Sequence, residues 1–139
     1  GSDVLPLADT YYRLCNMLLS TGTDFGPTLA AARDALPDDD RIQALHYVTQ
    51  SLAPDPRISD AAKARLQAVF ASSQTLGEGA ALRSMVATVF HNAALSLVYY
   101  GDIDRAVLAL QQALAWDPQR ATTRQMLTTI NELLEANPQ

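Results

Sequence analysis

The stretch from Ala87 to Arg120 constrains the fold most, because its apolar residues recur every three or four positions on both sides of a single glycine. Such spacing places side chains on one face of an α-helix. The first apolar stripe consists of Val89, Phe90, Ala93, Ala94, Leu97 and Val98, and the second of Ile103, Ala106, Val107, Leu110, Ala113 and Leu114. We therefore expect two amphipathic helices joined at Gly101.

The ends of these two predicted helices carry residues that helix termini favour. Gly101 ends the first helix, because only glycine takes the left-handed conformation at low cost. Asp102 or Asp104 caps the second, where a carboxylate accepts unpaired backbone N–H groups at the positive end of the helix dipole. Asp117-Pro118 ends that helix, since proline disfavours helix in the residue before it.

This unit of residues 87–120 resembles one tetratricopeptide (TPR) repeat, a helix–turn–helix unit of about 34 residues. The resemblance is carried by Phe90, Ala93, Ala94, Leu97, Gly101, Asp102, Ala106, Leu110, Ala113, Leu114, Asp117 and Pro118. The first helix departs from the usual pattern, with Ala93, Ala94 and Leu97 where leucine, glycine and tyrosine are common. The resemblance implies an all-α fold, a TPR-like right-handed superhelix of antiparallel helix pairs with about seven helices.

A second, degenerate copy of the repeat is predicted at residues 25–57. The segment Gln50–Pro56 matches Gln112–Pro118 at five of seven positions. The remaining predicted helices are Leu5–Ser20, Pro27–Leu36, Arg41–Ala53, a helix capped by Ser59 that runs to Ser73, residues 80–100, and Ala121–Glu135. The last helix has one polar face, as expected of a helix that closes a repeat array.

One domain is expected over residues 3–139, since 139 residues suit a single core. Gly1-Ser2 is interpreted as an expression-tag scar on a segment excised from a larger, bacterial-type protein.

The net charge of −5 and the absence of a basic run argue against nucleic acid as partner. No uninterrupted apolar run approaches the roughly 20 residues of a membrane span, so no direct membrane insertion is expected. The compartment, cytoplasmic or periplasmic, is left open.

Catalytic and metal-binding patterns are absent from the sequence. His46 and His91 form no ligand pair, and Cys15 is expected to be a buried small apolar residue. The run Asp38-Asp39-Asp40 lacks the spacing of a calcium loop and is interpreted as a helix start. Gly77-Glu78-Gly79 follows no strand, which disfavours a phosphate-binding loop. We expect no enzyme activity, no cofactor and no metal.

The predicted function is therefore protein–protein interaction, in assembly or scaffolding. The TPR resemblance implies a concave groove for a peptide or helix of a partner. Its groove-facing positions fall on Thr88, His91, Asn92, Leu95, Tyr99, Thr122, Gln125, Met126 and Thr129. The basic residues with which chaperone-binding TPRs hold a terminal carboxylate are missing at these positions, and only Asn92 matches. We expect a near-neutral groove that suits apolar anchors.

Two alternatives stay open from the sequence. The helices could serve homodimerisation or a purely structural role, in which case the groove would be the dimer interface. The chain could also be an accessory domain of a membrane enzyme or of a transcription regulator.

Overall fold

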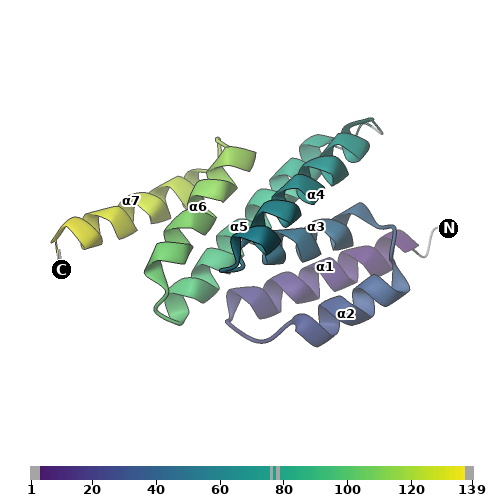
Figure 1. The fold of residues 1–139 in the computed structure, drawn as a ribbon, viewed down its shortest axis with the longest axis horizontal. Helices are drawn as coiled ribbons and strands as arrows, with labels where there is room; N and C mark the ends of the chain where they lie inside the picture. The colour runs from purple at the N-terminus through teal and green to yellow at the C-terminus, as the bar shows by residue number, and fades with distance from the viewer. Residues whose placement is uncertain (1–3, 76, 78, 137–139) are drawn as a thin grey trace.

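The computed structural model describes residues 4–75, 77 and 79–136, and in this part of the chain every regular element is an α-helix (Figure 1). The seven helices are α1 Val4–Ser20, α2 Gly26–Ala35, α3 Asp40–Ser51, α4 Pro56–Thr75, α5 Gly79–Tyr99, α6 Ile103–Trp116 and α7 Ala121–Ala136. The all-α fold is confirmed, and each predicted helix is present. The predicted tag residues, Gly1 and Ser2, lie outside the described residues.

Helix α5 is the centre of the fold. It packs against α1, α3, α4 and α6, most extensively against α6. Val86, Ala87, Val89, Phe90 and Ala94 are almost entirely buried on it. By length and composition α5 is apolar enough to cross a membrane, a property that buried core helices share. In this structure 44 % of that apolar stretch is buried among the surrounding helices.

The α5–α6 turn has the geometry that its residues predict. Gly101 has a φ of +80°, and its N–H donates to the Val98 carbonyl at 3.0 Å, while the Asp102 N–H donates to Leu97 at 2.8 Å. These two bonds satisfy the last free carbonyls of α5. Asp102 caps α6 by accepting the Arg105 N–H at 3.3 Å, and Asp104 lies in the first turn. Of the two predicted caps, the structure selects Asp102.

The repeated heptapeptide makes the same aspartate contact twice, although the helix ends differ: α3 ends at Ser51 and α4 begins at Pro56, whereas α6 runs to Trp116 and α7 begins at Ala121. Asp55 Oδ1 accepts the N–H of the residue two positions on, Arg57, at 2.9 Å, and Asp117 Oδ1 accepts that of Gln119 at 3.2 Å. The helices around the two turns pack differently, however. Helix α3 packs far more extensively on α4 than on α2. The closest helix pair in this half of the chain is thus α3–α4, not the α2–α3 pair that a repeat at residues 25–57 implies.

The start of α4 corrects one prediction. Helix α4 begins at Pro56, so Ser59 lies inside its first turn and donates its Oγ–H to the Pro56 carbonyl at 3.3 Å. Asp55 takes the capping role, because its side chain and its carbonyl accept N–H groups of the first turn. Proline suits this first position since it has no N–H to satisfy. The predicted Ser59 cap is therefore wrong.

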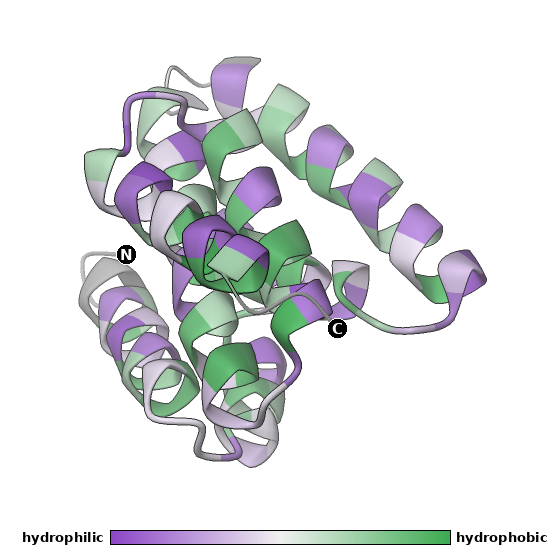
Figure 2. Cartoon of the chain, turned by 90° about the vertical axis from the view of Figure 1, so that its left-hand side faces the viewer, coloured by the Kyte–Doolittle hydropathy of each residue, from purple (hydrophilic) through white to green (hydrophobic). Residues whose placement is uncertain are grey.

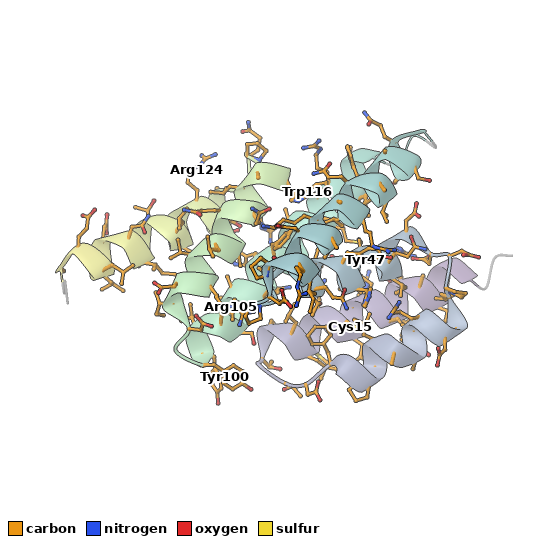
Figure 3. All side chains as sticks on the ribbon, in the orientation of Figure 1. Cys15, Tyr47, Tyr100, Arg105, Trp116 and Arg124 are labelled. Carbon is orange, nitrogen blue, oxygen red and sulfur yellow. The ribbon has the colours of Figure 1, made fainter. Side chains whose placement is uncertain are left out.

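Trp116, at the end of α6, anchors that helix to α4. Its ring is buried and meets Phe70 edge to face, with the ring centres 5.5 Å apart. The Arg83 guanidinium of α5 lies over Phe70 at 4.7 Å, and its Nη1–H donates to the Trp116 carbonyl at 3.3 Å. Figure 3 shows Trp116 between α6 and α4. The tryptophan was not among the predicted core residues.

The C-terminal helix α7 is only half covered. Met126, Leu127 and Ile130 pack against a small cluster around Leu110, but Leu133 and Leu134 are 60 % and 46 % exposed. Figure 1 shows α7 extending away from the other helices toward the C-terminus. The alternation of polar and apolar residues along the outer helices is visible in Figure 2.

Candidate functional site

An open cleft of about 940 Å³ lies on one side of the described part of the chain. It lies at the N-terminal ends of α3 and α5, between α1 and the end of α4. The apolar residues that line it are Tyr12, Ala81, Leu82 and Met85. The charged residues that line it are Asp9, Asp38, Asp39, Asp40 and Arg41. Hydroxyl groups are contributed by Ser72, Ser73, Ser84 and Thr88.

The arrangement of α1 on α5 creates this cleft. The two helices are joined beyond the cleft, where Asn92 Nδ2 donates to Asn16 Oδ1 at 3.1 Å. Farther along, the Tyr100 hydroxyl donates to the Gly22 carbonyl just after α1; Figure 3 shows Tyr100 at this end of α5. These contacts hold the later parts of both helices together, and the space beside their earlier parts is left open.

The rim of the cleft is acidic, with four aspartates against one arginine. Asp39 caps α3 by accepting the N–H groups of Arg41 and Ile42 at 2.9 and 3.2 Å, which confirms the helix-start interpretation of the aspartate run. Asp9 pairs with Arg13 at 2.8 Å and with Arg41 at 3.6 Å.

Asp38 is the aspartate of this rim that faces solvent. It is exposed, and within the described ranges it makes no hydrogen bond or ion pair. The cleft thus presents a carboxylate to solvent beside an apolar floor, whereas the sequence predicts a near-neutral groove.

The predicted groove residues of α5 are divided by the structure. Only Thr88 lines the cleft. Asn92 is bonded to α1, and the His91 Nδ1 lies 2.9 Å from the Thr123 hydroxyl of α7. Leu95 is half-buried. Tyr99 is 74 % exposed, with its ring edge to face against Tyr100. The first half of α5, rather than its middle, therefore offers the open surface.

The predicted groove residues of α7 lie apart from the cleft lining. Thr122, Gln125 and Thr129 are exposed, and the Thr129 hydroxyl donates to the Gln125 carbonyl of its own helix at 3.0 Å. Met126 is half-buried against the cluster around Leu110. Nothing in their contacts joins these four residues to Thr88 in one surface.

A polar cluster between α5 and α7 is the feature that the sequence did not reveal. Arg120 Nη1 donates to the Thr88 hydroxyl at 2.9 Å, and Thr123 is fully buried beside His91. Burial lowers the pKa of His91, and the charge of Arg120 lowers it further. Arg120 lies in the turn between α6 and α7, and Thr123 lies beside the face of α7 that was predicted to be polar. The periodicity of apolar residues therefore gave no reason to place either residue in a site.

The lone thiol and the other histidine offer no reactive group. Cys15 is fully buried, and burial raises its pKa to about 11, as predicted for a small apolar residue of the core. Burial also lowers the pKa of His46, with a smaller effect of Arg33. No group of three histidine, cysteine or acidic residues in the described chain could hold a metal ion. The absence of enzyme activity and of metal stays a prediction.

The described residues thus form helices around an open cleft with an acidic rim and an apolar floor. No protein-family model, curated protein or solved structure matches the chain.

Proposed function

We propose that this chain is a non-catalytic, TPR-like interaction module that binds a peptide or helix of a partner protein in the cleft beside α5. The observation that carries the proposal is the combination of an apolar floor with an acidic rim in a space of about 940 Å³. A cleft of this size accommodates several side chains of a bound segment. A concave, mostly apolar space with a few polar groups at its edge is the usual shape of a binding site.

The chemistry of the cleft favours one kind of partner segment. The floor of the cleft is formed by Leu82 and Met85, which are buried with 4 % and 8 % of their surface exposed, and a methionine side chain can adapt its shape to a ligand. Asp38 offers an exposed carboxylate at the rim. A segment with an apolar anchor next to lysine or arginine fits both features. The acidic balance of the whole chain, −5, also favours a basic partner.

The TPR-like right-handed superhelix remains part of this proposal. Its support is the packing of consecutive helices as the close pairs α3–α4 and α5–α6. The Gly101-Asp102 turn and the closing helix α7 are further support. In such an arrangement the helices that begin each pair share one face, on which a partner segment can lie.

Homodimerisation is a second candidate, favoured by the outer face of α1. Leu7, Leu14 and Met17 are 42 %, 37 % and 56 % exposed. Their spacing of seven and three residues places them on one side of the helix. In a dimer these residues would be covered by the second copy.

The test uses two short, fluorescent, amidated helical peptides. One contains lysine, leucine and methionine; the other has glutamate in place of lysine. We expect the basic peptide to bind and the acidic one to bind far more weakly. Asp38→Asn should weaken the basic peptide about two- to fivefold, the range of an exposed charge pair, and Asp60→Asn, the same change at an exposed site on α4, should not.

A second pair of variants locates the binding. Ala81→Gln places a larger neutral side chain in the cleft, and Ala80→Gln makes the same change at the neighbouring exposed residue that does not line it. Binding should fall about tenfold or more only for Ala81→Gln. Equal affinities of these two variants, or no binding of the basic peptide, would reject the cleft. A doubled solution mass that Leu14→Gln restores to that of a monomer would favour the dimer.

A further inference from the structure

Arg120 is a partly buried cation without an anionic partner. Its Nη1 donates to the neutral Thr88 hydroxyl at 2.9 Å. Its Nε is buried, and within the described residues it has no hydrogen-bond partner. Ion pairs of the described chain are made by Arg13, Arg41, Arg57 and Arg105. A guanidinium removed from water in this way ordinarily has a carboxylate or phosphate beside it, because its desolvation is otherwise uncompensated.

The printed side-chain hydrogen bond of Arg120 goes to an uncharged group, the Thr88 hydroxyl. Beside it, the Thr123 hydroxyl contacts His91, whose pKa is lowered by burial and by the charge of Arg120. Across the cleft, burial raises the pKa of Tyr12, and the charge of Arg120 acts in the opposite direction. The guanidinium is therefore near enough to α1 to influence the phenol.

Thr88 connects the arginine to the cleft. Thr88 and Tyr12 both line the cleft, while Arg120 itself stands behind Thr88. The aspartates of the rim belong to α1 and to the start of α3. The cleft thus has an acidic rim and, behind Thr88, a guanidinium whose Nε has no hydrogen-bond partner among the described residues. Such a charge pattern fixes the direction in which a polar segment can bind.

We propose that Arg120 binds a carboxylate of the partner segment beside Thr88, so that this segment carries a basic residue toward Asp38 and an acidic group toward α7. This inference rests on the proposed function, since it concerns the same cleft. A guanidinium can hold a carboxylate through two parallel N–H···O bonds, which supplies direction as well as affinity. The carboxylate is either a glutamate side chain or the terminal carboxylate of the segment.

Three versions of the basic peptide distinguish these sources. The first is amidated and has no carboxylate; the second adds one glutamate at its end; the third has a free C-terminus. We expect one of the two carboxylates to tighten binding about tenfold. Arg120→Gln should abolish this gain. Arg124→Gln, which removes an exposed arginine one helical turn away, should retain it. Urea unfolding of each variant verifies that it is folded.

The outcomes separate the two proposals. If the carboxylate-free peptide binds but neither carboxylate tightens it, or if Arg120→Gln keeps the gain, the role of Arg120 is wrong and the cleft proposal stands. If no peptide binds, the cleft proposal fails, and sodium acetate alone then tests Arg120. Acetate should shift the Arg120 Nε–H resonance more than chloride does at equal ionic strength. Equal shifts would overturn the inference.

Discussion

Replacement of Leu110 by alanine should destabilise the fold by about 3–4 kcal/mol. Leu110 is fully buried on α6, next to Ala94, Ala106 and Ala109. The substitution removes three carbon atoms, at roughly 0.8 kcal/mol each by transfer from water. The neighbouring alanines are too short to fill the space, so a cavity term of about 1 kcal/mol adds to the loss.

The same helix offers a matched control. Leu108 lies two residues earlier on α6 and is 56 % exposed, so Leu108→Ala makes the same chemical change at nearly the same helical position. We expect it to cost less than about 1 kcal/mol, as is usual for exposed sites. The difference between the two variants then measures burial rather than helix propensity.

Urea unfolding provides the assay. Trp116 is the single tryptophan of the chain and is buried, so its fluorescence reports the packing of α6, and far-UV circular dichroism reports helix content. The two signals should change together if unfolding is two-state. Equal costs for Leu110→Ala and Leu108→Ala would show that the buried face of α6 is assigned wrongly.

Three further predictions concern single groups. Gly101 has a φ of +80°, and an added side chain would meet no neighbouring atom. Stability should therefore fall in the order Gly, Asn, Ala, Val, because these residues differ in the backbone strain that a positive φ imposes on them. An unchanged urea midpoint for Gly101→Val would contradict this. The Cys15 thiol, with its pKa raised to about 11 by burial, should react with a disulfide reagent at mildly alkaline pH only after unfolding, so rapid reaction of the folded protein would refute its burial. The folded-state pKa of His91 is lowered, so its contribution to the free energy of unfolding is present above about pH 6.5 and is lost as the pH falls toward the lowered value. The free energy of unfolding should therefore depend less on pH in His91→Gln than in the unchanged protein. Equal pH slopes for the two proteins would refute the shift.

The helices and their ends were determined by the sequence itself. Periodicity placed all seven helices, and the residues at Gly101, Asp102 and Asp39 specified how three of the ends are made. These features depend on neighbours a few positions away, so spacing and turn chemistry suffice to predict them. The Ser59 cap was wrong for the same local reason, since Asp55 next to Pro56 is the stronger start signal.

The cleft and its charges were decided by the tertiary structure alone. Asn16 and Asn92 are 76 positions apart, and Thr88 and Arg120 are 32 apart, yet each pair is hydrogen-bonded. Helical periodicity shows which face of a helix is apolar, but it does not show which other helix will cover that face or where two helices leave a space. The sequence thus predicted Thr88 as an interaction residue, while Arg120 and the aspartates of the cleft come near it only because α1, α3 and the start of α7 pack around α5.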